Sequence, residues 1–284
     1  MMHKYRHFEI SCKIHHLMVK IRRAIDTAFT FLGGHSRNLH SKIRIMTKLS
    51  VNINKVALIR NSRGANYPNL LKIAKDCEEF GADGITVHPR PDERHITYAD
   101  IPLLKDTVTT EFNIEGYPSR RFLDMVLASP PHQCTLVPDL PGALTSDNGW
   151  DTVTHQNELK DIVAELQDAG IRVSLFIAPD KHLLDAAKET NAERIEFYTG
   201  PFAHMYAQSP TESIRGFAAA AKHCNNIDLG INAGHDLNLK NLHFFKNNIP
   251  GLLEVSIGHA LICDSLYYGL KNTIQMYQNE LKRD

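Results

Sequence analysis

Two kinds of hydrophobic pattern alternate along the chain from Leu49 onward. Short apolar or β-branched runs predict strands, and longer stretches with apolar residues every three to four positions predict helices. We expect eight strands, at 49–54, 84–88, 111–115, 133–137, 171–177, 193–197, 227–232 and 252–257. We expect helices after them, at 68–80, 98–108, 119–129, 154–169, 180–190, 211–224 and 238–247, with a long last helix at 260–281.

Residues at the predicted boundaries support this alternation. Gly81 and Gly170 stand where a left-handed residue would end a helix, and Asp180 stands where a side chain would cap the next one. An open doubly wound sheet would show a glycine-rich turn after its first strand, but the first glycine beyond that strand is Gly64. Eight strand–helix units in this length predict an α/β fold, a (β/α)8 TIM barrel with additional helices.

The first 45 residues differ from the rest in charge. They hold nine Lys and Arg residues against Glu9 and Asp26, which leaves 23 basic and 30 acidic residues in 46–284, a net charge of −7. We expect 1–45 to be a basic N-terminal extension, disordered or translated from an early start codon, and 46–284 to be the barrel domain. An acidic domain does not favour a nucleic-acid partner, because cations are needed against phosphates.

Localisation follows from what the sequence does not contain. No apolar stretch is long enough to span a bilayer, and residues 1–45 lack the apolar block of a secretory signal. The five cysteines include no Cys-x-x-Cys pair, so they are interpreted as free thiols in a reducing compartment. We therefore expect a cytoplasmic protein with no membrane partner.

Unusual polar residues stand at the carboxyl ends of the predicted strands. In a (β/α)8 barrel these ends converge on one mouth, where active sites lie. The positions are Asn52, Asn54, His88, Glu115, Glu196, His235 and His259. Buried in the barrel, Glu115 would have a raised pKa that suits proton transfer near neutrality, and Glu196 would follow it. The alternative for Glu115 is a structural carboxylate paired with Arg90. The alternative for the histidines is a structural role as hydrogen-bonded residues.

Two segments near the end of the barrel are candidates for phosphate binding. Residues 232–235 (Asn-Ala-Gly-His) and 256–260 (Ser-Ile-Gly-His-Ala) have small residues that let backbone N–H groups approach an anion. Ordinary tight turns would use the same glycines. Forked donors for a second phosphate would come from Arg60, Arg63, Arg90 and Arg94. A metal site is the less favoured interpretation, because no His-Glu-x-x-His cluster is present and Lys55 would repel a cation.

The order and spacing of these motifs resemble the pyridoxine 5′-phosphate synthase family over about 49–280. The motifs are Val51-Asn52-Ile53-Asn54, Arg60-Asn61-Ser62-Arg63-Gly64, Gly81-Ala82-Asp83-Gly84-Ile85-Thr86-Val87-His88, Arg94-His95-Ile96-Thr97, Asn113-Ile114-Glu115, Leu136-Val137-Pro138, Thr199-Gly200, Asn232-Ala233-Gly234-His235 and Ile257-Gly258-His259-Ala260.

This resemblance implies an enzyme that condenses 1-deoxy-D-xylulose 5-phosphate with 3-amino-2-oxopropyl phosphate, releasing phosphate and water. It implies no metal and no organic cofactor, and a homo-octamer. His88 and Glu115 match the family's proton acceptors, His235 its proton donor, and Glu196 the residue that stabilises the transition state. The matched substrate contacts are Asn52, Arg63, Gly258 and His259 for the amino ketone phosphate, and Asn54, Lys55, Arg90, His95 and Thr145 for the deoxyxylulose phosphate.

The chain departs from the family pattern at two places. The family often has Asp-His where Asn54-Lys55 stands, and Gly where Asp236 follows the matched proton donor. We expect Asp236 to lie beside the phosphate loop as a substrate contact, unless it caps the next helix. Two other functions remain open: a metal-dependent lyase or hydrolase that takes a phosphorylated substrate, and a non-enzymatic binding protein for a phosphometabolite.

Overall fold

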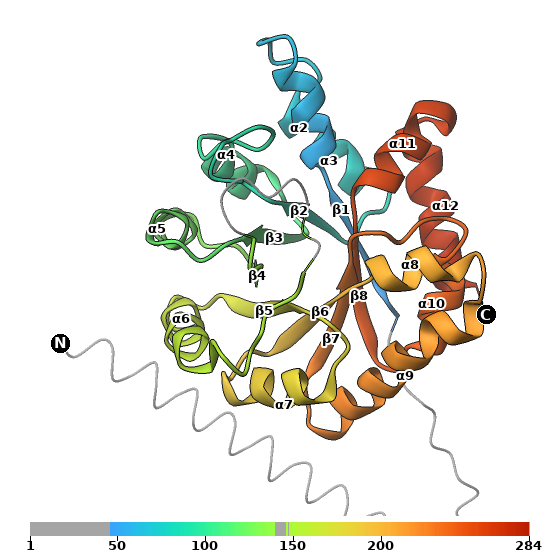
Figure 1. Cartoon of the computed structure of the whole chain (residues 1–284). Helices are drawn as coiled ribbons and strands as arrows, with labels where there is room; N and C mark the ends of the chain where they lie inside the picture. Colours follow the sequence, from blue (N-terminus) through green and yellow to red (C-terminus); the bar gives the residue numbers. More distant parts are fainter. Residues whose placement is uncertain (1–45, 140–145, 147, 284) are drawn as a thin grey trace, which may run out of the picture. The chain divides into compact units, whose positions relative to one another are not determined.

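Eight parallel strands form a closed barrel in the order of the sequence, with β8 beside β1 (Figure 1). The computed structural model describes residues 46–139, 146 and 148–283. The strands are β1 Lys48–Asn52, β2 Gly84–Val87, β3 Glu111–Gly116, β4 Gln133–Leu136, β5 Arg172–Ile177, β6 Arg194–Tyr198, β7 Gly230–Gly234 and β8 Leu252–Ile257. The predicted (β/α)8 barrel is confirmed. The predicted basic extension, 1–45, lies outside the described residues and stays a prediction.

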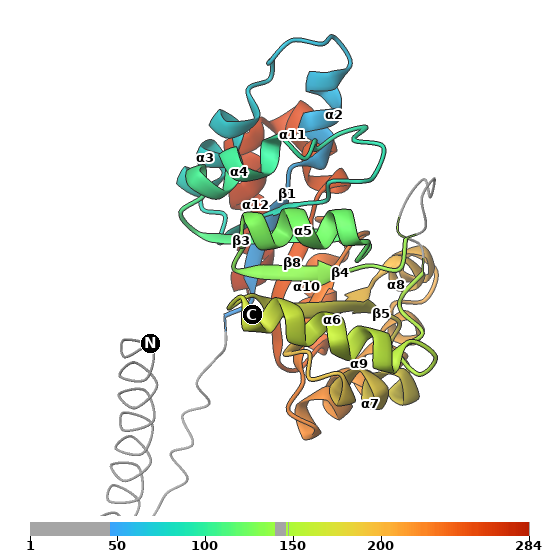
Figure 2. The ribbon, with the colours of Figure 1, turned by 90° about the vertical axis from the view of Figure 1, so that its left-hand side faces the viewer.

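Helices surround the barrel, as the two perpendicular views show (Figures 1 and 2). They are α2 Asn54–Asn61, α3 Leu70–Glu79, α4 Asp100–Thr107, α5 Arg120–Ala128, α6 Gln156–Asp168, α7 Lys181–Glu189, α8 Gly200–Tyr206, α9 Pro210–Asn226, α10 Leu242–Asn248, α11 His259–Tyr268 and α12 Leu270–Lys282. In the described part of the chain, none of the helices has both the length and the apolar character to cross a membrane.

The predicted helix boundaries at Gly81, Gly170 and Asp180 are confirmed. Gly81 has φ +106° and Gly170 has φ +76°, the left-handed region that a side chain makes costly, and each stands just after the C-cap residue of a helix. The Asp180 side chain accepts hydrogen bonds from the backbone N–H groups of the first turn of α7.

Several predicted elements were wrong in extent. The first strand stops at Asn52, and Asn54 begins α2 instead. Strand β7 covers Gly230–Gly234 rather than 227–232. The expected long helix at 260–281 is two helices that meet at Gly269. The short helices α2 and α8 were not expected at all, because a helix of seven or eight residues is too short to show a clear apolar period.

The two faces of the strands differ in chemistry, and β3 shows the rule. Phe112 and Ile114 pack into the apolar core between barrel and helices. The alternate residues point into the barrel, where they reach other strands: Glu111 contacts Arg172 of β5, and Asn113 accepts a hydrogen bond from Thr135 of β4. The barrel interior is therefore polar along its length. The candidate site lies at the end of the barrel where the carboxyl ends of the strands meet.

Candidate active site

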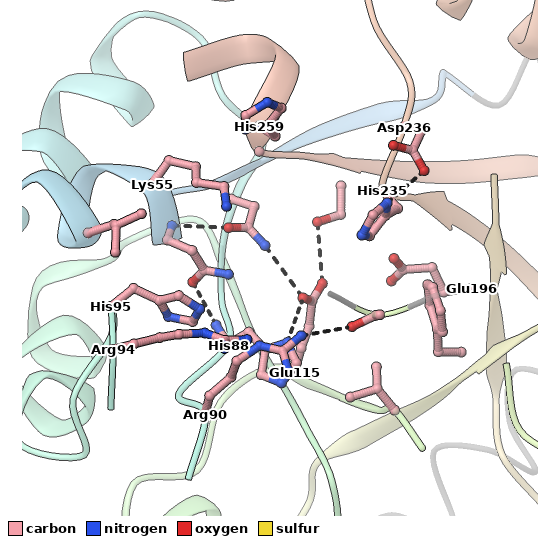
Figure 3. A pocket seen from close by; sticks show the side chains of 18 residues that line it. Lys55, His88, Arg90, Arg94, His95, Glu115, Glu196, His235, Asp236 and His259 are labelled. Carbon is pink, nitrogen blue, oxygen red and sulfur yellow. Dashed lines mark hydrogen bonds and ion pairs between the residues drawn. The ribbon is translucent and has the colours of Figure 1, made fainter. Parts of the chain in front are cut away.

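A cavity of about 620 Å³ lies at the carboxyl ends of the strands (Figure 3). It is lined by side chains that lie in or after each of the eight strands. The predicted site residues that line it are Asn52, Asn54, Lys55, His88, Arg90, Arg94, His95, Glu115, Glu196, His235, Asp236, Gly258 and His259. Residues far apart in the sequence thus meet at one mouth, as the barrel geometry requires.

Glu115 and His88 lie side by side in this cavity. The Nδ1 atom of His88 is 4.0 Å from Oε2 of Glu115, and both side chains are almost fully buried. Glu115 also accepts long hydrogen bonds of 3.4 Å from Asn52 and from Ser256. The backbone N–H of His88 donates to Oδ1 of Asn54 at 2.9 Å, so the first residue of α2 fixes the end of β2.

Burial sets the protonation of this pair. It raises the pKa of Glu115 to about 7, against a weaker opposing effect of His235. It lowers the pKa of His88 well below the ordinary value, and the positive charge of Arg90 acts in the same direction. At neutral pH, Glu115 is therefore close to the midpoint between its two protonation states, and His88 is a neutral imidazole with one ring nitrogen that carries no proton.

Glu196 contributes a second buried carboxyl group, from β6. Burial, followed by the neighbouring Glu115 and Glu254, raises its pKa well above the ordinary value. Gly234 on β7 leaves room for it: a Cβ atom there would lie 2.1 Å from the Glu196 Oε1 atom. Glu196 therefore holds its proton more tightly than an exposed carboxyl group does, at the wall of the cavity.

Cationic and donor groups lie on the side of the cavity opposite Glu196 (Figure 3). Arg90 forms a 2.7 Å ion pair with Asp139, whose carboxylate also accepts from Ser146. Burial and Arg90 lower the pKa of His95 to about 4. The Nδ1 atom of His95 accepts the N–H of Ile96, so its proton is on Nε2, which can donate to a ligand oxygen.

The segment after β8 has the geometry of an anion site. Gly258 is the N-cap of α11, whose first N–H groups carry the positive end of the helix dipole. A Cβ atom on Gly258 would lie 3.0 Å from the Cβ of Asn52, so glycine is what allows this close approach to the end of β1. His259, the first residue of the helix, lines the same cavity.

Three other predicted residues are not found among the described residues that line the cavity: Arg60, Arg63 and Thr145. Arg63 is exposed just beyond α2 and is not among the residues that line the cavity. Thr145 lies outside the described residues. Arg60, a candidate phosphate donor, is instead held by Asp100 in a two-pronged ion pair of 2.7 and 2.8 Å. Its guanidinium is used for structure, which corrects that expectation.

Five lining residues had not been predicted: Leu58, Val137, Ser146, Phe176 and Ser256. The apolar ones look like any core residue in the sequence, so no signal distinguished them. Ser256 belongs to a motif that had been singled out for its glycine and histidine. Asp236, in contrast, was expected as a substrate contact or a helix cap. It caps no helix, because α10 begins after Asn241, and its carboxylate contacts Nδ1 of His235 at 2.7 Å.

Within the described residues, no group of three or more His, Cys, Asp and Glu side chains has an arrangement that could hold a metal ion.

Solved structures of low sequence identity share the fold. Tryptophan synthase from M. tuberculosis aligns with a TM-score of 0.56 at 13% identity, over 84% of this chain and 94% of that chain. A protein from Aquifex aeolicus aligns with a TM-score of 0.57 at 14% identity, also over 84% and 94%. At this identity the likeness extends to the fold alone.

Curated relatives match much more closely in sequence. The chain is 56% identical over 237 residues to the pyridoxine 5′-phosphate synthase of Bacteroides fragilis, covering 84% of this chain and 100% of the relative. It is 56% identical over 238 residues to the protein of that name from Cytophaga hutchinsonii, with the same coverage. The profile of the family described as pyridoxal phosphate biosynthesis protein PdxJ matches residues 49–283, which include all eight strands except the first residue of β1. The chain belongs to this family.

Proposed function

We propose that this enzyme is a pyridoxine 5′-phosphate synthase. It joins 1-deoxy-D-xylulose 5-phosphate to 3-amino-2-oxopropyl phosphate and releases pyridoxine 5′-phosphate, inorganic phosphate and water. The observation that carries the proposal is one cavity in which proton-transfer groups face a cationic side. The name printed for the curated relatives supports it.

The reaction needs several proton transfers in one place. The amine must add to a ketone and lose water, a phosphate must be eliminated, and a carbon–carbon bond must close the ring. In the proposal, Glu115 and His88 accept protons, His235 donates one, and Glu196 stabilises the transition state. Groups whose pKa values are separated by their surroundings suit such a sequence, and here burial separates them.

Two phosphorylated substrates need two anion sites. The proposal places the amino ketone phosphate at Asn52, Gly258 and His259, at the start of α11, together with Arg63. It places the deoxyxylulose phosphate at Arg90, His95 and the Asn54–Lys55 pair, together with Thr145. Holding both substrates in one cavity removes much of the entropic barrier to a reaction between two molecules.

The proposal includes catalysis without a metal or organic cofactor, a cytoplasmic location and a homo-octamer. Its assembly is supported by three exposed apolar side chains at the end of α11: Leu266, Tyr267 and Tyr268. Light scattering of the purified protein measures the mass of the assembly, and eight chains are expected.

The activity is tested with both substrates present. We expect phosphate release in equal amount to pyridoxine 5′-phosphate, detected by its ring absorbance, and neither product when one substrate is left out. Prior treatment with a chelator should leave the rate unchanged. Phosphate released from a single substrate without formation of the ring would contradict the proposal, and loss of activity to the chelator would favour a metal-dependent reaction.

A further inference from the structure

His235 has an unusual backbone conformation. It follows β7 with φ +90°, a region that is costly for any residue with a Cβ atom. Such a conformation persists only where the surroundings hold it in place. The residues that hold His235 therefore matter for where its imidazole points.

Thr199 secures the backbone on both sides of His235. Its buried hydroxyl donates to the carbonyl oxygen of Gly234 at 2.6 Å and accepts the backbone N–H of Asp236 at 3.2 Å. The backbone N–H of Thr199 also donates to the Gly234 carbonyl at 3.3 Å. One side chain at the end of β6 thus ties down the residue before His235 and the residue after it.

Asp236 secures the imidazole itself. Its Oδ2 atom is 2.7 Å from Nδ1 of His235, and Figure 3 shows the ring between this carboxylate and the cavity. An ionised carboxylate only accepts hydrogen bonds, so Nδ1 must carry a proton, and in the proposed function Nε2 is the ring atom that takes part in proton transfer. The carbonyl oxygen of Asp236 in turn accepts from the side chains of Asn238 and Asn241.

The Tyr198 ring makes a third contact with His235. It meets the His235 ring edge to face, with 5.6 Å between the centroids. Contacts from β6, from the loop after β7 and from the neighbouring aromatic ring therefore leave the imidazole little freedom.

We propose that Thr199 and Asp236 are positioning residues for His235: Thr199 fixes its strained backbone, and Asp236 fixes its ring orientation and its Nδ1–H tautomer. This inference rests on the proposed function, in which His235 donates a proton: the proton leaves Nε2 of the doubly protonated ring, and the Nδ1–H stays hydrogen-bonded to Asp236. It gives Asp236 a role other than substrate contact, on the side of the ring away from the substrates.

Kinetics with both substrates tests the inference. Asp236→Ala, Asp236→Asn and Thr199→Val should each lower kcat about a hundredfold, because a small misplacement of a catalytic group has effects of this size. KM for each substrate should change less than threefold. Asp236→Asn belongs with the damaging changes because its amide can donate to Nδ1 and favour the other tautomer. Thr199→Ser keeps the hydroxyl and should restore most of kcat.

The chain offers a matched control. Asp185 of α7 and His223 of α9 form a second carboxylate–imidazole pair, at 2.5 Å, away from the cavity. Asp185→Asn removes the same kind of contact and should leave kcat unchanged. If Asp236→Ala retains kcat within twofold, or if it raises only KM, Asp236 does not position His235.

Crystal structures give a readout independent of turnover. Without ligands, Asp236→Ala should show the His235 ring rotated or spread over several positions, and Thr199→Val should show its φ shifted from +90°. A ring and backbone unchanged in both variants would overturn the inference. If wild-type protein makes no pyridoxine 5′-phosphate, the proposed function fails, while these structures still decide whether the two residues hold His235.

Discussion

At the scale of single residues, the acidic side chains in this barrel differ in pKa. Glu115 has a pKa of about 7 because it is buried, and its hydrogen bonds to Asn52 and Ser256 are too long to compensate. Glu111, at the other end of the same strand, is also buried, but Arg172 and Arg194 outweigh burial and lower its pKa. One strand thus carries an ionised structural carboxylate and an acid suited to proton transfer.

Glu115→Gln should lower kcat by about 10²–10⁴-fold, the usual contribution of a general acid–base group. The amide has nearly the same shape: its oxygen can accept from Asn52 while its NH2 group donates to the Ser256 hydroxyl, so thermal stability should change little. Initial rates of phosphate release and a melting curve measure the two effects. Glu165→Gln, on the exposed surface of α6, is the matched control and should have wild-type kcat. A Glu115→Gln rate close to wild type would remove Glu115 from the mechanism.

The pH dependence of kcat/KM provides a second check on Glu115. A proton acceptor must be ionised, so activity should be lost as the pH falls through about 7. The measured value belongs to the coupled set of Glu115 and its neighbours rather than to one residue. The residual activity of Glu115→Gln should lack this acidic limb, whereas persistence of the limb would assign it to another group.

Much of the site could be predicted because polar residues at strand ends are conspicuous in an apolar pattern. His88, Glu115 and His235 were found in this way and line one cavity. The partner of each group could not be predicted. Arg60 and Arg90 look alike in the sequence, but Arg60 pairs with Asp100 outside the cavity and Arg90 lies within it. Pairing depends on distances between loops, which spacing along the chain does not contain.

At the scale of elements, strands were predicted best where their apolar runs end abruptly. Strand β8 begins and ends as expected, at Leu252–Ile257. Strand β7 was placed too early, because Ile227 and Leu229 look like strand residues but belong to the turn after α9, where Asp228 has φ +53°. The break between α11 and α12 was missed because apolar periodicity continues through Gly269, whose φ of +76° ends the first helix.

Two exposed glycines should respond in opposite directions to the same substitution. Gly269 joins α11 and α12 with φ +76° and ψ 146°, which only glycine adopts readily, so Gly269→Ala should lower the free energy of unfolding by about 1–3 kcal/mol. Gly216 lies within α9 without positive φ, and no atom is within 4 Å of an added Cβ. Gly216→Ala should raise the free energy of unfolding by about 0.5–1 kcal/mol.

Denaturant unfolding of the two alanine variants and wild type gives this comparison directly. Each variant adds one methyl group to open space, so packing is the same in both and the backbone conformation makes the difference. Both variants should keep wild-type kcat, because neither glycine lines the cavity. Equal changes in stability would mean that the helix break at Gly269 is not imposed by its backbone angles.

At the scale of the whole molecule, a column of ionisable groups occupies the barrel interior. Glu254 of β8 is 3.6 Å from Arg194, and burial together with the charge of Glu111 raises its pKa to about 8. Glu196, paired in register with Asn232, which is itself in register with Glu254, has its pKa raised as well. The folded barrel therefore holds protons on carboxyl groups that would be ionised in the unfolded chain.

These protons make stability depend on pH with a definite sign. For Glu115, Glu196 and Glu254 the pKa is raised on folding, so their contribution is complete below pH 4.5 and is lost as the pH rises through about 7 for Glu115 and about 8 for Glu254. His88 and His95 act in the opposite sense, because their lowered pKa costs stability only below pH 6.5. Above pH 6.5 these histidines no longer offset the loss.

We therefore expect the free energy of unfolding of the ligand-free protein to fall between pH 6.5 and pH 8, on the order of a few kcal/mol. Denaturant unfolding at fixed protein concentration and ionic strength measures this slope. Glu254→Gln removes one of the three acids and should flatten it, whereas Asp124→Asn on the exposed surface of α5 should not. A constant or rising stability would mean that the buried acids are already ionised in the folded barrel. Glu115 would then be a carboxylate throughout this range, and the acidic limb expected in kcat/KM would have to come from elsewhere.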